Sequence, residues 1–493
     1  MCGVTTAKSV PVAAPGTVTK PRRTPFMVWG ERIDPGADPR EIEFPAGARN
    51  AVPRFDEEVA DRVLAGSGVN LADVSLQEIV TFLNRAGQLW KNEEYARRRL
   101  YIRELQRLHG YSQKMAETEA DLISTTLRAH TQMHDMVAVE LGHRAIMDHW
   151  IRREDAEVRA YPRGTSVHVL PGNVPYSTTV SLLRALVTKN AAVLKYSAGE
   201  PATAVALAQS LCDVDPDHPV TKSVCAVFWD RDCQQGKRVL AAADVICAWG
   251  GADAITSALR ACSPEGVVVP FGPMRSLTVV GKDADLARAC RGIAHDASMY
   301  EQRACFSTHQ VFTDGDPAAL VEQLQRDLEF YEDLLPRTAV TADEAAHVSL
   351  EAAAHRFLGS TVRTGSWGAV ITTAPADVVD LPSARTVFVH PVADLREVYE
   401  WVDPAVQTVG MAPWSLVHTH RDELAGRGVT RFVEAGLSPL FRLGGTHDGL
   451  QPLVMMTRMV AVEAPRDDYG KTMVSPVDQS EFLEHSRLRD LLA

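Results

Sequence analysis

Long apolar runs and paired cysteines are both missing from this chain of 493 residues. No stretch approaches the roughly 18 uninterrupted apolar residues that a membrane-spanning helix needs, so we expect no membrane span. The first thirty residues lack an apolar stretch after their basic positions, which argues against a secretory signal. None of the eight cysteines lies in a CxxC pair, so we predict no metal site. These absences together predict a cytoplasmic protein with reduced thiols.

An excess of basic residues is also missing. The chain has 51 Lys and Arg against 63 Asp and Glu, a formal net charge of −12. Because phosphate binding favours a basic domain, we do not expect nucleic acid as a partner. Apolar residues make up 45% and charged residues 23%, the proportions of an ordinary globular protein. The length allows one to three domains with a large core.

The composition changes along the chain. Residues 1–50 are rich in Pro, Gly and Arg, which predicts a tail or extended arm. Residues 56–149 carry apolar side chains at helical spacing and predict a layer of long helices. From residue 166 short β-branched runs alternate with helical segments, and a second such set covers residues 309–462. This alternation is typical of parallel sheets covered on both faces, so we predict an α/β fold with two Rossmann-like lobes.

Loops that follow strands are the first place to look for a site, because open parallel sheets bind ligands beyond the carboxyl ends of their strands. Pro171, Gly172 and Asn173 follow one predicted strand and form a rigid corner. The Asn173 amide can stabilise an oxyanion, or it can simply bond its own backbone in a turn. Lys195 ends the next strand, where it can reach a ribose or phosphate or remain a solvated edge residue.

Two further loops carry possible chemistry. Gly250 and Gly251 follow another predicted strand and permit close approach of a pyrophosphate to a helix N-terminus, although tight packing explains them equally well. Cys305 lies between a predicted helix and a strand. Near backbone N–H groups and Arg303, its thiol can have a lowered pKa and act as a nucleophile. The alternative is one more buried core cysteine.

The order and spacing of these positions resemble those of the aldehyde dehydrogenase superfamily. The segments HVLPGNVP (168–175), DVICAWGGADAI (244–255), VPFGPMRS (269–276) and EQRACFSTHQVF (301–312) are more closely similar to LuxC-type acyl-CoA reductases, the fatty-acyl reductases of bacterial bioluminescence. The resemblance covers residues 75–462. It implies an aldehyde dehydrogenase-like fold with two Rossmann-like lobes and a small oligomerisation β-element.

The resemblance also implies roles for individual residues. Cys305 matches the acyl-accepting nucleophile, and Asn173 matches the asparagine that forms the oxyanion hole with the Cys305 N–H. Lys195 matches the lysine on the adenosine ribose, and the glycine pair matches the turn beside the dinucleotide phosphates. The full cofactor-binding set implied is Pro171, Gly172, Lys195, Ser197, Ala198, Gly250, Gly251, Phe271 and Gly272.

Two departures from the hydrolytic aldehyde dehydrogenases refine this expectation. Phe271 stands at or beside the glutamate that activates water in those enzymes, and no carboxylate lies between residues 267 and 278. Water attack on an acyl-enzyme should therefore be slow, which favours thioester chemistry. Ala198 replaces the glutamate that NAD-preferring members place three residues after the lysine. Its loss removes repulsion against a 2′-phosphate and favours NADPH, although Glu200 nearby works against this.

The resemblance further implies a division into domains. Residues 51–149 and 164–285 would form the cofactor-binding domain, and residues 286–462 the catalytic domain. Residues 150–163 and 463–493 would form the oligomerisation element of a homodimer or homotetramer.

We therefore expect NADPH-dependent reduction of an acyl-CoA or acyl-carrier-protein thioester to an aldehyde. The alternatives are a CoA-acylating aldehyde dehydrogenase working oxidatively, a phosphate-releasing relative, or a catalytically idle binding subunit on the same fold. One helical segment is rich in arginine, which suggests either a docking face for an acidic carrier protein or a solvated helix with internal Glu–Arg pairs. Its arginines are Arg97, Arg98, Arg99, Arg103 and Arg107.

Overall fold

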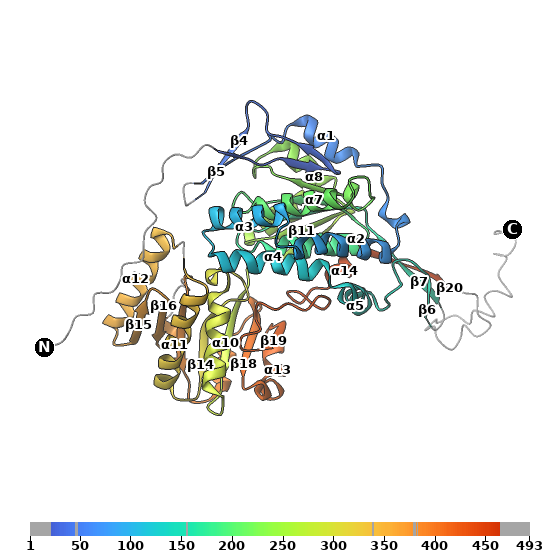
Figure 1. Cartoon of the computed structure of the whole chain (residues 1–493). Coiled ribbons are helices and arrows are strands. Elements are labelled where there is room, and N and C mark those ends of the chain that lie inside the picture. The colour runs from blue at the N-terminus through green and yellow to red at the C-terminus, as the bar shows by residue number, and fades with distance from the viewer. Residues whose placement is uncertain are drawn as a thin grey trace, which may run out of the picture.

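Two seven-stranded sheets form the body of the molecule (Figure 1). The computed structural model describes residues 21–44, 48–153, 156–337, 340–377, 381 and 383–463. The first sheet has the order β12-β11-β8-β9-β10-β2-β3. The strands from β12 to β10 are parallel, and the four inner ones, β11, β8, β9 and β10, are mostly buried, so they consist largely of apolar residues such as Val, Ala, Ile and Leu. Its strands are β2 (Phe26–Val28), β3 (Glu31–Ile33), β8 (Thr165–Val169), β9 (Ala191–Lys195), β10 (Val224–Val227), β11 (Val245–Trp249) and β12 (Val267–Phe271).

The N-terminal region is part of this sheet. β2 pairs antiparallel with β10, and Phe26 is fully buried with its ring 6.3 Å from that of Phe55. β1 (Arg22–Arg23), β4 (Arg40–Glu43) and β5 (Arg49–Val52) form a separate three-stranded sheet. The tail predicted for residues 1–50 is therefore wrong for the described residues from 21 onwards; residues 1–20 and 45–47 lie outside the described chain. The prediction failed because β2 has only three residues, which is too short for a strand to be recognised from its pattern of apolar residues.

Helices cover both faces of the first sheet. α6 (Tyr176–Val187) and α7 (Ala202–Val214) connect β8, β9 and β10, and the predicted helical layer packs on them. The strand order reverses after β10, which places the next connections on the opposite face. The layer consists of α2 (Leu76–Lys91), α3 (Ala96–His109) and α4 (Gln113–Leu127), followed by α5 (His130–Leu141); the opposite face carries α1 (Glu57–Ala65), α8 (Gln234–Ala241) and α9 (Ala252–Ala261).

The second sheet has the order β15-β16-β17-β14-β13-β18-β19 and is parallel except for β15. β13 belongs to it, so the lobes meet at residues 272–274 and not at the predicted boundary of 285/286. Only three residues separate β12 from β13. The sequence therefore shows two successive strands there and does not indicate that they belong to different sheets. Its strands are β13 (Arg275–Val280), β14 (Thr308–Thr313), β15 (Thr361–Gly365), β16 (Gly368–Thr372), β17 (Thr386–Pro391), β18 (Val406–Ala412) and β19 (Arg431–Glu434); its helices are α10 (Leu286–Ser298), α11 (Pro317–Leu334), α12 (Ala342–Phe357) and α13 (Val417–Gly426).

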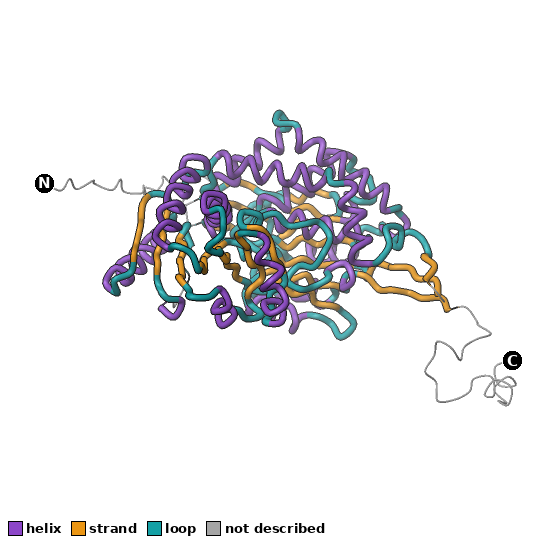
Figure 2. The backbone as a smooth tube through the Cα atoms, turned by 90° about the horizontal axis from the view of Figure 1, so that it is seen from below, coloured by secondary structure: helices purple, strands orange, loops and turns teal. Residues whose placement is uncertain are grey.

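A three-stranded antiparallel sheet projects from the body (Figures 1 and 2). It consists of β6 (Ile151–Arg153), β7 (Ala156–Pro162) and β20 (Thr457–Glu463), and the short helix α14 (Pro452–Met455) precedes β20. Strands are present in the predicted β-element at 150–163, but β20, except for its last residue Glu463, lies within the range predicted for the catalytic domain. Residues 464–493 of the predicted oligomerisation element lie outside the described chain.

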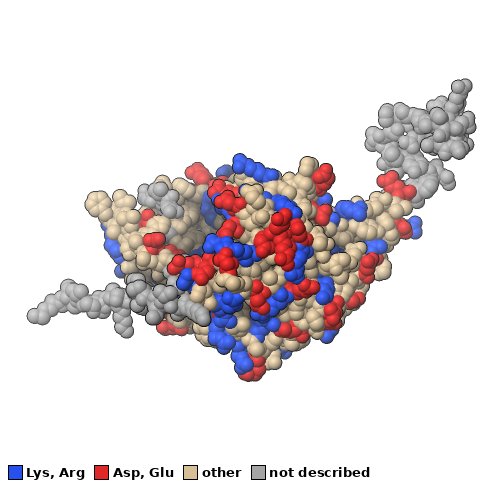
Figure 3. Space-filling model, turned by 90° about the horizontal axis from the view of Figure 1, so that it is seen from above, with Lys and Arg blue, Asp and Glu red and all other residues tan. Residues whose placement is uncertain are grey.

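The arginine-rich segment is α3, and most of its charges are paired. Arg97 bonds Asp213, Arg98 lies 2.8 Å from Asp121, and Arg107 pairs with Glu104. Acidic and basic side chains are interspersed on the face shown in Figure 3. Arg99–Glu94 and Arg107–Glu104 are the expected internal pairs, whereas Arg97 and Arg98 bind aspartates of the neighbouring helices α7 and α4. Nothing in these pairs tests the docking face, which stays a prediction. Among the described helices, none is both long and apolar enough to cross a membrane.

Candidate functional site

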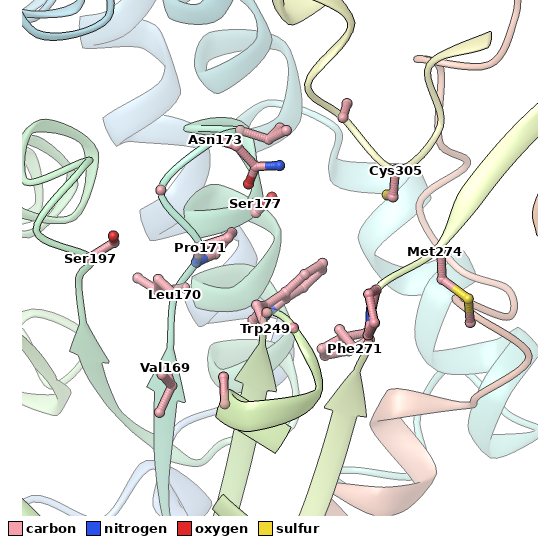
Figure 4. A pocket seen from close by; sticks show the side chains of 18 of the residues that line it. Val169, Leu170, Pro171, Asn173, Ser177, Ser197, Trp249, Phe271, Met274 and Cys305 are labelled. Carbon is pink, nitrogen blue, oxygen red and sulfur yellow. The ribbon is translucent and has the colours of Figure 1, made fainter. Parts of the chain in front are cut away.

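A cleft of about 860 Å³ lies at the carboxyl ends of β8, β9, β11 and β12, where the two lobes meet (Figure 4). The structure brings almost every predicted site residue into it; Ala198 is the exception among them. The predicted residues that line the cleft are Pro171, Gly172, Asn173, Lys195, Ser197, Gly250, Gly251, Phe271, Gly272 and Cys305.

Asn173 and Cys305 approach the cleft from opposite lobes (Figure 4). The Asn173 Nδ2 donates a hydrogen bond of 2.7 Å to the carbonyl oxygen of Arg303, two residues before the cysteine. The Ser276 hydroxyl donates to the carbonyl of Cys305 itself at 2.8 Å. The first bond fixes the asparagine corner against the cysteine loop, and the second fixes that loop to β13. They make the Asn173 amide and the cysteine neighbours in one site, as an oxyanion hole requires.

The turn before the cysteine is left-handed. Tyr300, Glu301 and Gln302 have φ angles of 56°, 54° and 63°, a conformation that costs residues other than glycine about 1 kcal/mol or more each. Buried partners hold all three. The Tyr300 hydroxyl donates to Glu119, Glu301 pairs with Arg385 at 3.0 Å, and the Gln302 amide donates to two backbone carbonyls at 2.8 and 2.7 Å. No glycine marks this turn, so a left-handed conformation could not be predicted from the residue types.

The Cys305 thiol is less acidic than predicted. Burial raises its pKa to about 12, and the nearby charge of Asp448 acts in the same direction. The backbone N–H groups of Cys305 and Phe306 act in the opposite direction. Arg303 was expected to lower the pKa, but its guanidinium pairs with Glu344 at 2.8 Å. The prediction of a lowered pKa is therefore wrong for this structure, and the thiol depends on close donors to ionise.

Two residues beside the cysteine were missed by sequence reasoning. The Gln407 Nε2 lies 3.6 Å from the Cys305 sulfur and also donates to the Asp448 carboxylate. Asp448 is the only acidic residue among the described residues that line the cleft. It has a φ of 54° and precedes Gly449, in the segment that returns from the second lobe to the first. The glycine-rich run GGTHDG (444–449) was the one available signal.

An aromatic pair forms one wall of the cleft. The rings of Trp249 and Phe271 stack with centroids 4.0 Å apart, and the His447 ring meets both edge-on. Both aromatic residues line the cleft near the cysteine (Figure 4). Phe271, which the resemblance placed at or beside the water-activating glutamate of hydrolytic aldehyde dehydrogenases, thus contributes an apolar surface to the cleft. Such a wall suits a flat ring system and disfavours an ordered water.

The glycine turn is open to a ligand. Gly250 has a φ of 149°, which only glycine adopts easily, whereas a Cβ on Gly251 or Gly272 would meet no atom within 4 Å. Packing therefore does not require these two glycines, and the alternative of tight packing fails there. Gly251 directly precedes α9, whose N-terminal N–H groups can receive a phosphate.

The far end of the cleft is cationic. Burial lowers the pKa of Lys195 to about 8, and its ammonium lies 5.6 Å from the centre of the Phe228 ring. Arg231, which sequence reasoning missed, is exposed and lines the same cleft with Ser197. Glu200 does not oppose them. Its carboxylate is buried and accepts the N–H groups at the start of α7, each at 3.0 Å.

No cluster of three or more possible metal ligands occurs within the described ranges. The cleft contains what a dinucleotide and a covalent acyl group would contact, namely a cationic end, an open glycine turn, an aromatic wall and a thiol beside an amide.

Comparison with known proteins identifies the family. The family model described as acyl-CoA reductase (LuxC) matches residues 71–459. The chain belongs to the acyl-CoA reductase (LuxC) family. A long-chain acyl-protein thioester reductase from Aliivibrio fischeri is 40% identical over 421 residues, which cover 84% of this chain and 88% of that protein. One from Photorhabdus luminescens is 39% identical over 426 residues, 84% of this chain and 88% of that protein.

The fold agrees with this membership. A NAD-dependent aldehyde dehydrogenase from Sinorhizobium meliloti superposes with a TM-score of 0.71 at 16% identity and covers 91% of this chain and 95% of that one. The predicted aldehyde dehydrogenase-like fold and the predicted LuxC family are both confirmed. Membership also confirms the predicted enzyme class, an aldehyde-forming acyl-thioester reductase.

Proposed function

We propose that this enzyme reduces a long-chain acyl thioester to the aldehyde with NADPH, through an acyl group carried on Cys305. The observation that carries the proposal is the position of the Cys305 thiol beside Asn173, in a cleft whose other end is cationic. The long acyl chain and protein-bound donor are those named for the relatives from Aliivibrio fischeri and Photorhabdus luminescens. An acyl carrier protein or CoA is the donor in this chain's reaction.

In the first half-reaction the Cys305 thiolate attacks the thioester carbonyl. The oxyanion accepts hydrogen bonds from the Asn173 amide and the Cys305 N–H, and the carrier thiolate leaves with the proton that the cysteine released. NADPH, when bound, supplies a hydride to the carbon of the acyl-cysteine. The same two donors then hold the oxygen of the thiohemiacetal, which collapses to aldehyde and the Cys305 thiolate. The thiolate then takes up one proton from solvent, which restores the Cys305 thiol, and the carbon has gained the two electrons of the hydride.

The residues of the cationic end support NADPH over NADH. Lys195, Ser197 and Arg231 line the part of the cleft that lies beyond the glycine turn, where an adenosine ribose would lie. Ala198 supplies no carboxylate there, and Glu200 is committed to capping α7. Among the described residues that line this end of the cleft none is acidic, and Asp230, which interacts with Lys195 from outside the lining, is paired with Arg40. A 2′-phosphate would thus meet two cations.

Reduction of the acyl-enzyme requires that its hydrolysis by water be slow. Phe271 and Trp249 supply an apolar wall, and the Asp448 carboxylate already accepts a hydrogen bond from Gln407. Asp448 is the one carboxylate in the described lining, and its hydrogen bond to Gln407 makes it a weaker base toward water near Cys305. Hydrolysis should therefore be slower than reduction, so that the acyl group persists until it is reduced.

To test the proposal, the enzyme is given NADPH and a panel of acyl-CoA and acyl-carrier-protein substrates. The consumption of NADPH is followed by its absorbance, and the aldehyde produced is measured in the same samples. One aldehyde per NADPH consumed supports reduction. NADPH binding without turnover of any thioester would favour the idle subunit or the acyl-phosphate reaction. The CoA-acylating alternative uses the same residues in reverse, and it would be recognised by faster aldehyde oxidation than thioester reduction.

We also propose that β6, β7 and β20 join copies of the chain into a homodimer or homotetramer. Light scattering of the full chain, compared with a chain lacking residues 151–162, tests this assembly.

A further inference from the structure

We propose that Gln407 is a hydrogen-bond donor to the Cys305 thiolate and that Asp448 is a positioning residue that holds the Gln407 amide toward the sulfur. This inference deepens the proposed function and rests on it only in taking Cys305 as the nucleophile. The three residues come from separate parts of the second lobe and the returning segment, so no contiguous motif contains them.

The contacts of Gln407 fix which way its amide faces. The side chain is 1% exposed on β18, its Nε2 donates to Asp448 and contacts the Cys305 sulfur at 3.6 Å, and its Oε1 accepts from Thr408 at 3.2 Å. If the amide were reversed, its oxygen would face the carboxylate of Asp448 and the sulfur together. Two acceptors in contact repel, so the carboxylate selects the orientation in which an N–H points at the sulfur.

The Gln407 N–H can stabilise the Cys305 sulfur at the two steps in which the sulfur is negatively charged. The thiolate attacks the thioester at the start, and it is the leaving group when the thiohemiacetal collapses. The S–H proton goes to the departing carrier thiolate, so Gln407 transfers no proton and only stabilises the anion. A hydrogen bond to a charged group changes an equilibrium by about 10-fold or more.

The charge of Asp448 acts against this benefit, and this makes its role testable. A carboxylate near a thiolate repels it, yet the same carboxylate orients the donor. Other charged groups face this centre: Arg431 on β19 interacts with Cys305, and Arg184 on α6 interacts with Asp448. The neighbouring His447 ring is buried against the aromatic wall. Variants that separate charge from orientation are therefore needed.

The test measures the rate of Cys305 alkylation by iodoacetamide as a function of pH, in the full chain, with the labelled peptide identified by mass spectrometry. Gln407→Met keeps the shape and removes the donor, so the alkylation midpoint should move up and the rate below it should fall about 10-fold. Asp448→Asn keeps an acceptor for the Gln407 N–H and removes the charge, so the midpoint should move down. Asp448→Ala removes both, so the freed amide should leave the midpoint higher than in Asp448→Asn.

A matched control is Gln310→Met on β14, whose amide contacts His390 and not the cysteine. It should leave the alkylation profile unchanged. An unchanged profile in Gln407→Met would overturn the donor role, and equal downward shifts in both Asp448 variants would overturn the positioning role. If Gln407→Met does not fold, Gln407→Asn withdraws the amide by one methylene and should raise the midpoint in the same way.

Because alkylation needs no turnover, the outcome is separate from that of the proposed function. If wild-type protein reduces no thioester while the alkylation shifts occur as expected, the proposed function fails and the pairing of Gln407 with the sulfur stands.

Discussion

Glu119 gives the enzyme a stability that should depend on pH. Its carboxyl is fully buried on α4, accepts a hydrogen bond from the Tyr300 hydroxyl, and has a pKa that burial raises to about 8 from an ordinary value of 4.5. A folded-state pKa above the unfolded value means that the folded state binds the proton more tightly. Its contribution is present at low pH and is lost as the pH rises from about 4.5 to about 8.

The magnitude follows from the shift. A rise of this pKa from 4.5 to about 8 corresponds to about 5 kcal/mol of stability lost across this pH range. Glu119→Gln keeps an oxygen that can accept from Tyr300 and cannot ionise. The variant should lose stability less steeply than wild type as pH rises, with the difference growing until about pH 8 and constant above it.

Urea denaturation at a series of pH values, followed by circular dichroism, measures this difference. The control is Glu117→Gln on the same helix, where Glu117 accepts a hydrogen bond from Gln113 near the surface. It should follow the wild-type pH dependence. Parallel stability curves for wild type and Glu119→Gln between pH 5 and 8 would refute the reasoning, because a carboxyl that changes its ionisation on unfolding must produce a slope.

Three further predictions concern the site. Cys305→Ala should form no acyl-enzyme with a radiolabelled acyl donor while NADPH fluorescence titration shows binding within about twofold of wild type; retained reductase activity would contradict the nucleophile. Ala198→Glu should raise the KM for NADPH about tenfold with little change for NADH, because the longer side chain at this exposed position beside Ser197 would bring a carboxylate to the adenosine end of the cleft and repel a 2′-phosphate; steady-state kinetics with both cofactors decide this. Gln302→Ala should lower stability by about 3 kcal/mol and slow acylation, because two buried carbonyls lose their donor; a wild-type melting temperature would argue against the anchoring role.

The sequence predicted the parts of the site that lie within short contiguous motifs. Asn173 and the glycine turn each follow a buried parallel strand, so the topology alone places them at one edge of a sheet. Cys305 precedes β14 and does not follow a strand, so its role as nucleophile rested on the resemblance of the segment around it to the family. The two-lobe α/β fold followed from the alternation of short apolar runs and helices.

The features of the site that were missed or wrongly predicted depend on contacts between residues far apart in the sequence. Gln407 and Asp448 meet the cysteine only because the chain returns from the second lobe, and no spacing rule connects them. The raised pKa of Cys305 comes from burial, which a sequence pattern does not measure. Arg303 looked like a free cation until the structure placed Glu344 against it.

Within the part of the chain that the structure describes, the backbone crosses between the lobes twice, and this restricts how the lobes can move relative to one another. Gly272 to Met274 form the first crossing, and the segment between β19 and α14, which contains Asp448, forms the second. A body tied at two points turns about the line that joins them and does not swivel freely. Both crossings line the cleft beside the cysteine, whereas Ser197 lies at its other end (Figure 4). A hinge rotation would therefore widen the entrance for the nucleotide while the reacting atoms, close to the axis, keep their mutual positions through successive turnovers.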